Sequence, residues 1–442
     1  MRDDWQTLGV AELGRAIEAG QIDPVELTEA FLAAIDTHEH ADRIFSVVTS
    51  DRARAEAAAA SERARLGVRR GPLDGVPLVW KDLFDSAGDE TKAGSDLLAG
   101  RVPDADAEVL ANATRAGAVC LGKTHMSELA FSGIGLNPVT ETPPNIHDAA
   151  LVPGGSSSGS ATATAFGLAP AGIGTDTGGS VRVPSAWNDL VGLKTTSGRL
   201  SLAGVVPLCT KFDTVGPLAR TVEDCALLLA AMEGGKSADL QGASLQGRRF
   251  LVLDTYTQDV REGPAKGFAD ALDRVARAGA RIERGTIDGI EAAMDLSPIL
   301  FTSEAYGTWK HVIEAAPDKM FGAILDRFRS GARYGAADYV AAWQFLDHLR
   351  GDWAAQIAGY DAVLLPTTPN LPPDAARLME EDEYYVTENL LTLRNTRIGN
   401  LMGLAALTLP TGVASTGIML LGQPFGEEAL LRLGRAVEAA LA

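Results

Sequence analysis

The chain has 442 residues, a length that fits either one large α/β domain or two to three smaller domains. Apolar residues make up 46% and charged residues 22% of it, which is typical of globular proteins and excludes a disordered or fibrous chain. The 58 acidic against 39 basic residues give a net charge of −19, which would repel a polyphosphate backbone, so we expect no nucleic-acid partner.

Residues that form cross-links or hold metals are scarce. The three cysteines, Cys120, Cys209 and Cys225, are too few and too widely spaced for a disulfide framework or a thiolate metal site, so we expect them to be buried in a reducing compartment. Residues 38–42 resemble part of a metal-hydrolase loop but lack its third histidine, and we interpret them as a solvated helix end. Residues 1–5 lack the apolar core of a signal peptide, and no stretch is apolar enough to span a membrane. We expect a cytoplasmic protein without metal, cofactor or membrane partner.

The N-terminal region is predicted to be helical and then to turn into a strand. Asp23, followed by a proline, is a typical helix start, and residues 51–65 indicate a second, exposed helix. Residues 75–80 form the short apolar run of a buried strand, which ends abruptly at Lys81. The sequence leaves two interpretations of Lys81 open: a neutral base whose pKa burial lowers, or a salt bridge with Asp82.

Helices and strands alternate along the rest of the chain. The predicted elements are a helix near 105–116, a strand at 118–121, a helix near 158–167, and strands at 169–173, 249–253 and 361–366. This alternation predicts an α/β fold in which helices cover a mostly parallel or mixed sheet. Because no repeat or linker marks a boundary, we expect residues 1–442 to form one domain, with helices of about residues 1–65 packed on its core.

Glycine and serine are concentrated in residues 153–180. An apolar stretch at 161–171 divides them, which indicates two structured turns rather than a flexible linker. A phosphate-binding loop would need a lysine, and none lies between Lys123 and Lys194. A dinucleotide-binding fingerprint would need a glycine where Thr177 stands.

A nucleophile elbow is formally present at residues 155–159, but no strand precedes it and no histidine partner is evident. What remains is serine chemistry without histidine, for which lysine is the usual substitute base. A lysine can act in this way only when it is neutral.

Motifs spread over nearly the whole chain resemble those of the amidase signature family. They are residues 74–82, 122–124, 154–160, 174–182, 192–194, 198–199, 213–221, 365–369 and 421–425. The resemblance implies an α/β fold with a large mixed β-sheet covered by helices on both faces. It also implies a hydrolase that needs no cofactor.

The same resemblance implies a catalytic triad of Ser180 as nucleophile, Ser156 as bridging serine after a cis peptide bond, and Lys81 as base. Glycines beside the nucleophile would let the backbone approach the substrate and bind the oxyanion. The substrate-binding positions that the resemblance implies are Thr177, Gly178, Gly179, Ser180 and Ser156.

Other polar residues near these motifs have two interpretations each. Asp176 and Arg182 form either a buried salt bridge or a substrate contact. Ser157 either hydrogen-bonds within the triad or stabilises the turn. Arg394 and Arg397 either bind a substrate carboxylate or are ordinary structural arginines.

We therefore expect an amidohydrolase that cleaves a carboxamide or related C–N bond through a Ser180 acyl-enzyme. The first alternative is the ammonia-releasing A subunit of a tRNA-dependent amidotransferase. Further alternatives are a hydrolase of carbamate- or urea-derived substrates, allophanate- or biuret-like, and a non-catalytic binding protein, which the intact triad disfavours. We expect a small-molecule amide as ligand, and the chain is compatible with a homodimer.

Overall fold

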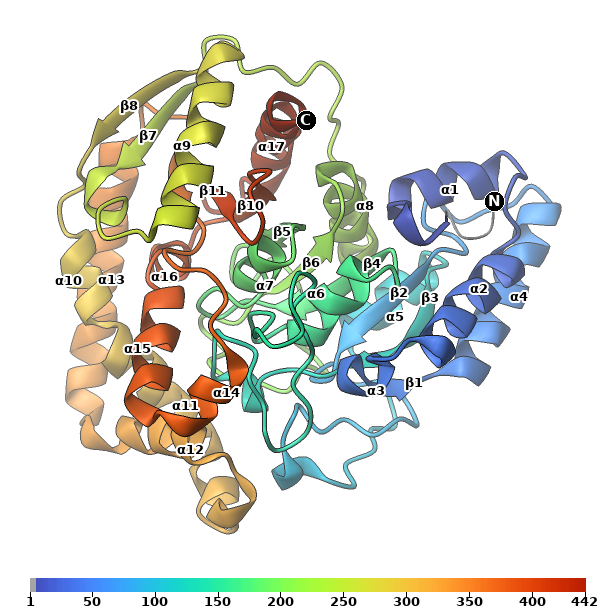
Figure 1. The fold of residues 1–442 in the computed structure, drawn as a ribbon, viewed down its shortest axis with the longest axis horizontal. Coiled ribbons are helices and arrows are strands. Elements are labelled where there is room, and N and C mark those ends of the chain that lie inside the picture. The colour runs from blue at the N-terminus through green and yellow to red at the C-terminus, as the bar shows by residue number, and fades with distance from the viewer. Residues whose placement is uncertain (1–4) are drawn as a thin grey trace.

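The computed structural model describes residues 5–442. Within this range eleven strands join into one sheet with helices on both of its faces (Figure 1). Residues 1–4, which contribute to the expectation that no signal peptide is present, lie outside the described range. The predicted α/β class with a large mixed sheet is confirmed.

The strands follow one another along the chain at intervals of very different length. They are β1 (Phe45–Val48), β2 (Pro77–Lys81), β3 (Val119–Thr124), β4 (Ala171–Thr175), β5 (Val191–Lys194), β6 (Val215–Ala219), β7 (Arg249–Leu253), β8 (Arg281–Gly285), β9 (Ala362–Pro366), β10 (Ala406–Pro410) and β11 (Gly417–Leu421).

Helices fill most of the chain between the strands. The α-helices are α1 (Val10–Glu18), α2 (Pro24–Thr37), α3 (Ala41–Ile44), α4 (Ser50–Arg65), α5 (Glu108–Arg115), α6 (Ser158–Ala165), α7 (Arg182–Trp187), α8 (Val222–Glu233), α9 (Glu262–Arg277), α10 (Ile290–Asp295), α11 (Ser297–Ile313), α12 (Gly322–Arg329), α13 (Ala336–Ile357), α14 (Ala375–Glu380), α15 (Asp382–Thr392), α16 (Thr396–Leu401) and α17 (Glu427–Leu441). Short 3₁₀ turns are η1 (Trp5–Thr7), η2 (Asp96–Leu98), η3 (Glu128–Ala130), η4 (Asp254–Tyr256), η5 (Pro317–Lys319) and η6 (Ser330–Arg333).

The strand order is β1-β3-β2-β4-β6-β5-β10-β11-β9-β7-β8. Strands β3, β2 and β4 form one parallel block and β9, β7 and β8 another, while the strands between them pair antiparallel. Strands β2 and β4 are buried along their whole length because helices or neighbouring loops cover both faces. This burial explains why such segments are continuous apolar runs rather than alternating patterns.

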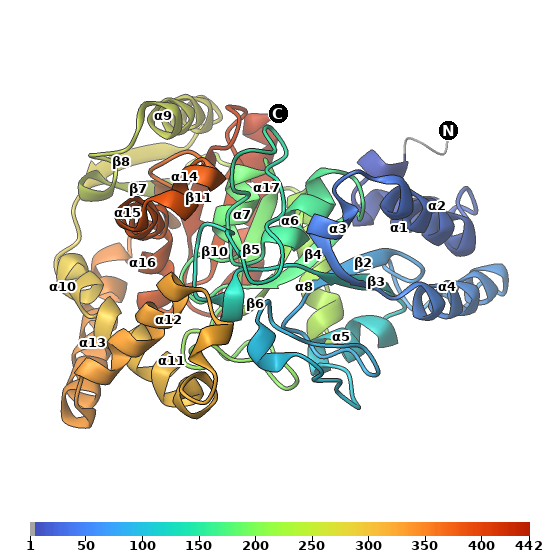
Figure 2. The same ribbon diagram turned by 60° about the horizontal axis from the view of Figure 1, so that its bottom comes forward.

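Helices α6 and α7 lie in front of the central strands in Figure 2, and α8 and α17 lie behind them. Two glycines let the front helices approach closely. A Cβ atom at Gly172 in β4 would lie 2.6 Å from the carbonyl oxygen of Ser160 in α6. A Cβ atom at Gly192 in β5 would overlap the Ser185 hydroxyl of α7. Side chains at either position would push α6 or α7 away from the sheet.

The N-terminal helices lie beside the β1 edge of the sheet, opposite the β7–β8 edge (Figure 1). Helix α2 packs on α4, which packs on β3, and α1 packs on α8. The Asp224 carboxylate of α8 accepts a hydrogen bond from the Ala11 backbone N–H at 2.9 Å. Asp23 caps α2 by accepting from the N–H groups of Val25 and Glu26, as predicted.

Element positions agree with the sequence patterns, but some boundaries differ. The helix expected near 105–116 begins only at Glu108. The strand expected at 118–121 continues to Thr124, through Lys123. Lys123 is buried, and its ammonium pairs with the Asp82 carboxylate. Because the charge is paired, the strand can continue past the point where the apolar pattern of the sequence ends.

The three cysteines are buried and unpaired, as expected. Of the segment at 38–42, His38 caps the end of α2, whereas residues 41 and 42 already belong to α3. The interpretation as a helix end is therefore correct for His38, but His38 and His40 are half-buried beside Phe166 rather than solvated. Within residues 5–442 no group of three His, Cys, Asp or Glu side chains is placed to hold a metal ion. No helix of that range is both long and apolar enough to cross a bilayer.

Candidate active site

Lys81 and Thr175 lie side by side because each ends a strand of the same parallel pair, β2 and β4. The Lys81 Nζ is 2.8 Å from the Thr175 Oγ1 and 2.7 Å from the Ser156 Oγ. Lys81 and Ser156 are both fully buried. The carboxyl ends of parallel strands are a common place for ligands in open α/β sheets.

The environment of Lys81 decides between the two interpretations of this residue. Asp82 pairs with Lys123, whose Nζ is 3.0 Å from its Oδ1, and no carboxylate among residues 5–442 lies within 4 Å of the Lys81 Nζ. Burial lowers the pKa of Lys81 to about 7, against the smaller opposing influence of Asp213 and Asp176. Lys81 is therefore neutral in a large fraction of molecules near neutral pH.

The loop that carries Ser156 is held by its neighbours on both sides. The Gly155–Ser156 peptide bond is cis, as the resemblance implied. The Ser156 carbonyl accepts a hydrogen bond from the Ser127 N–H at 3.2 Å, and the Ser157 N–H donates to the Ser180 carbonyl at 3.2 Å. These contacts bring the two Gly/Ser turns together.

Ser157 stabilises the turn. Its hydroxyl donates to the Thr175 carbonyl at 3.2 Å and accepts from the Thr175 N–H at 3.3 Å. These contacts are with the end of β4 rather than with Lys81, so of the two interpretations the structure supports the turn.

Ser180 lies in the short loop between β4 and α7 and is 5% exposed. Gly179 in this loop has a φ of +144°, a conformation that side chains disfavour. A Cβ atom there would overlap the Thr396 Oγ1 of α16. The Thr396 hydroxyl in turn donates to the Gly178 carbonyl at 2.7 Å, so α16 fixes the loop from outside.

The backbone N–H groups of Thr177, Gly178, Gly179 and Ser180 are unused. No acceptor within residues 5–442 takes a hydrogen bond from any of the four. The Thr177 side chain points elsewhere, with its hydroxyl donating to the Asp213 Oδ1 at 2.5 Å. A run of free N–H donors beside a serine is the geometry that stabilises an oxyanion.

Asp176 and Arg182 form a fully buried salt bridge, with Nη2 2.9 Å from Oδ1. Asn400 completes the pair: its Nδ2 donates to the Asp176 carboxylate, and its Oδ1 accepts from Arg182. The guanidinium of Arg182 holds the pKa of Asp176 well below its usual range, although burial alone would raise it. Of the two interpretations, the structure supports the salt bridge, which ties the Ser180 loop to α16.

A small cleft opens onto Ser180, Thr177 and Gly178. Much of its wall is apolar, formed by Ala130, Phe131, Leu208, Phe301 and Leu393. Arg327 and Arg397 also line it. The cleft is small, so it suits a short acyl group.

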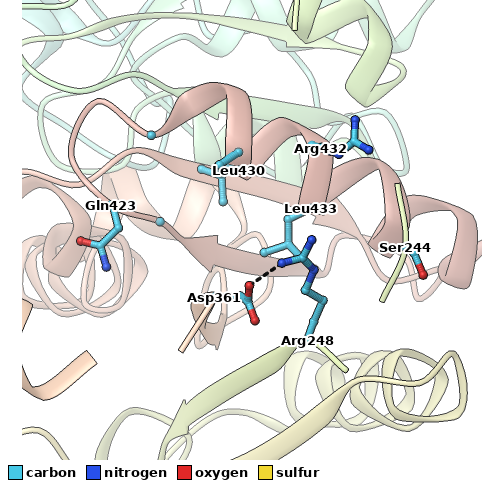
Figure 3. Close-up of a pocket in the computed structure, with 10 residues that line it drawn as sticks. Ser244, Arg248, Asp361, Gln423, Leu430, Arg432 and Leu433 are labelled. Carbon is cyan, nitrogen blue, oxygen red and sulfur yellow. Dashed lines mark hydrogen bonds and ion pairs between the residues drawn. The ribbon is translucent and has the colours of Figure 1, made fainter. Parts of the chain in front are cut away.

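Another pocket lies beside α17, near the starts of β7 and β9 (Figure 3). Its Arg248 and Asp361 side chains are paired with each other at 2.8 Å, and Figure 3 shows Gln423 and Leu430 farther along the same pocket. It contains none of the predicted site residues. The cleft at Ser180, in contrast, is lined by Thr177, Gly178 and Ser180 of the predicted site.

A family model for amidases matches residues 26–431 of the chain. The chain belongs to the amidase signature family. It is 34% identical to a 2-amino-5-chloromuconic acid deaminase from Comamonas testosteroni, covering 98% of this chain and 97% of that protein. It is 32% identical to the A subunit of the glutamyl-tRNA(Gln) amidotransferase from Anaeromyxobacter sp. strain K, covering 98% and 96%. A crystal structure of an amidase superposes with a TM-score of 0.89 at 30% identity, covering 98% of this chain and 100% of that one.

Some residues of the site in this family member were not found from the sequence. Thr175 is the second partner of the Lys81 ammonium, and Asp213 accepts from Thr177. Arg327 reaches the cleft from α12, far from every motif. For Thr175 and Asp213 a signal existed, since each is a polar residue at or beside the end of a buried strand. For Arg327 the sequence holds no signal.

Proposed function

We propose that this chain is an amidohydrolase that cleaves a small carboxamide or related C–N bond through an acyl-enzyme on Ser180. One observation carries the proposal. Lys81 is buried, has no carboxylate partner within 4 Å among residues 5–442, and is hydrogen-bonded to Ser156. A lysine in this position is of little use to stability, because burial of its charge without a partner is costly.

In the proposed first step, neutral Lys81 takes the proton of the Ser156 hydroxyl while Ser156 takes the proton of Ser180. The Ser180 Oγ then attacks the carbonyl carbon of the amide, and the C=O π electrons move onto oxygen. The N–H groups of residues 177–180 would stabilise the negative charge that develops there.

Collapse of this intermediate re-forms the carbonyl and breaks the C–N bond. The proton held by Lys81 passes through Ser156 to the leaving nitrogen, which departs as ammonia or an amine. Water then attacks the acyl-enzyme, with its proton moving along the same pair of residues, and the acid is released with Ser180 restored. The cycle consumes one water and needs no cofactor.

The test is hydrolysis of a panel of aliphatic, aromatic, carbamate-type and urea-type amides by the purified chain. We expect Ser180→Ala and Lys81→Ala to lower kcat by about 10⁴-fold or more, because such residues act as a unit. Ser158→Ala is the matched control, because this buried serine lies two residues from Ser156 and the one hydrogen bond of its hydroxyl within the described residues goes to the His125 carbonyl at 3.3 Å. Near-normal turnover of either triad variant would refute the proposal.

A second candidate is the A subunit of a tRNA-dependent amidotransferase, favoured by the 32% identity to such a protein over nearly the full length. It predicts glutamine hydrolysis that depends on partner subunits. We propose instead that the isolated chain is active on its own. Robust hydrolysis of simple amides by the chain alone would support this, and activity confined to glutamine in the presence of partners would support the second candidate.

A further inference from the structure

Two arginines from distant segments share the cleft with Ser180. Arg327 comes from α12 and Arg397 from α16. The Arg327 Nη1 donates to the Phe131 carbonyl at 2.9 Å, and its guanidinium lies 4.4 Å from the centre of the Phe131 ring. Arg397 donates from Nε to the Leu393 carbonyl at 3.2 Å and from Nη2 to the Leu390 carbonyl at 3.1 Å. These contacts hold the two side chains in place.

Neither arginine has an acidic partner. No carboxylate among residues 5–442 lies within 4 Å of either guanidinium, whereas Arg182, Arg199 and Arg261 are all paired. Burial, and then the charge of Arg327, lower the pKa of Arg397 to about 10, and burial lowers the pKa of Arg327 as well. Two neighbouring cations in a partly closed cleft repel each other unless an anion joins them.

Arg397 lies directly beside the residues that would bind the oxyanion. A Cβ atom built on Gly178 would lie 3.6 Å from the Arg397 Cγ. Its neighbour Thr396 donates to the Gly178 carbonyl at 2.7 Å, which fixes the start of α16 against the loop. An anion bound by the two arginines would therefore lie only a few atoms away from the carbonyl carbon that Ser180 attacks.

We propose that this cleft binds amides that carry a carboxylate a few atoms from the scissile carbonyl, with Arg327 and Arg397 as the residues that select the carboxylate. The proposal rests on the amidase function and specifies its substrate class. A guanidinium matches the planar geometry of a carboxylate and strengthens the hydrogen bonds through charge. The remaining apolar wall suits the short methylene chain between the two groups.

The first experiment compares two substrates of the same shape. Succinamate carries a carboxylate, and 4-methylpentanamide carries an isopropyl group in its place. We expect the unmodified protein to favour succinamate by at least tenfold in kcat/KM. We expect Arg397→Gln and Arg327→Gln each to lower kcat/KM for succinamate about tenfold or more, chiefly through KM, while turnover of 4-methylpentanamide changes little.

Arg394→Gln is the matched control. Arg394 lies three residues from Arg397, does not line the cleft, and donates to the Asn395 side chain and the Gln258 carbonyl. We expect this variant to keep the preference for succinamate. Equal hydrolysis of the two substrates by the unmodified protein, or an equal loss on both in the Arg327 and Arg397 variants, would overturn the proposal.

A second measurement needs neither catalysis nor a stable variant. Calorimetric titration of the unmodified protein with levulinate, a methyl ketone that carries the carboxylate of succinamate, should show binding at least tenfold tighter than that of 5-methylhexan-2-one, which carries an isopropyl group in its place. Equal affinities would overturn the proposal. The outcomes also separate the carboxylate site from the amidase function. Ser180-dependent hydrolysis without a carboxylate preference would support the amidase function alone. Selective levulinate binding without hydrolysis of any amide would support the carboxylate site alone.

Discussion

At the scale of single residues, Lys81 and Lys123 show how position decides the chemistry of a lysine. Both lie at the carboxyl ends of neighbouring parallel strands and both are buried. Lys123 has the Asp82 carboxylate at 3.0 Å, while the partners of Lys81 among residues 5–442 are the hydroxyls of Ser156 and Thr175. Hydroxyls can donate to a neutral amine as well as accept from an ammonium, so they allow a proton to move.

The pH profile follows from this environment. Because burial lowers the pKa of Lys81 to about 7, the base is protonated and inactive below that value and neutral above it. We expect kcat/KM to rise about tenfold per pH unit on the acid side and to level off above about pH 7. Initial rates on a neutral amide from pH 5 to 9 measure this, and a flat profile across that range would contradict the role of Lys81 as base.

The pH at which kcat/KM levels off should depend on Asp213. The negative charge of Asp213 favours the protonated form of Lys81. Asp213→Asn removes that influence and should move the rise in kcat/KM to lower pH. The backbone N–H groups of Leu208 and Cys209 both donate to the Oδ2 of Asp213, so a single amide oxygen at that position can still accept both hydrogen bonds. The same rate measurements on the variant check the shift, and movement to higher pH would show that the charge acts in some other way.

At the scale of elements, the loop between β4 and α7 takes its shape from packing against α16. Thr396 leaves no room for a side chain at Gly179, and the Asp176–Arg182 pair joins the loop to Asn400. The free N–H groups of the loop therefore depend on a helix more than 200 residues later in the chain. Loops that bind charge must be held rigidly, since misaligned donors lose most of their effect.

Gly179→Ala should damage catalysis more than stability. The new Cβ would overlap the Thr396 Oγ1 and must displace the loop. We expect kcat to fall about 10²–10³-fold, the effect of losing an oxyanion donor. Gly198→Ala is the control, because Gly198 also has a positive φ, at +84°, but faces open space. Equal kcat values for the two variants would contradict this account of the loop.

The buried ion pair should matter for stability. Asp176→Asn leaves the Arg182 guanidinium without its counter-charge in a fully buried site. We expect a loss of about 3–5 kcal/mol in the free energy of unfolding. Denaturant unfolding measures it, with Glu29→Gln at a surface ion pair as a control that should leave the midpoint unchanged. A similar midpoint for both variants would show that Asn400 alone can satisfy Arg182.

At the scale of the whole molecule, the residues buried around the sheet come from nearly the full length of the described sequence. Cys120 in β3, Cys209 before β6 and Cys225 in α8 are all buried and come from separate parts of this core. Burial raises the pKa of Cys120 to about 12 and raises those of the other two well above the usual range. That residues 1–442 form one domain remains a prediction.

The cysteines provide a test of this core. We expect no reaction of the native protein with a thiol-specific disulfide reagent, and titration of all three thiols after unfolding, because thiolates are the reactive form. Absorbance of the released thiolate counts them. Reaction of one thiol under native conditions would locate a part of the core that opens independently of the rest.

The sequence by itself determined the α/β class, most strand positions, the family and the identity of Lys81, Ser156 and Ser180 as candidates. These follow from apolar runs and motifs, which are local along the chain. Only the tertiary structure decided whether Lys81 or Lys123 has the acidic partner, that Asp176 and Arg182 pair with each other, and which arginines reach the cleft. Such contacts depend on the order of strands in the sheet and on helices that lie far away in sequence. A single segment cannot determine them, because burial and charge pairing are properties of the packed chain.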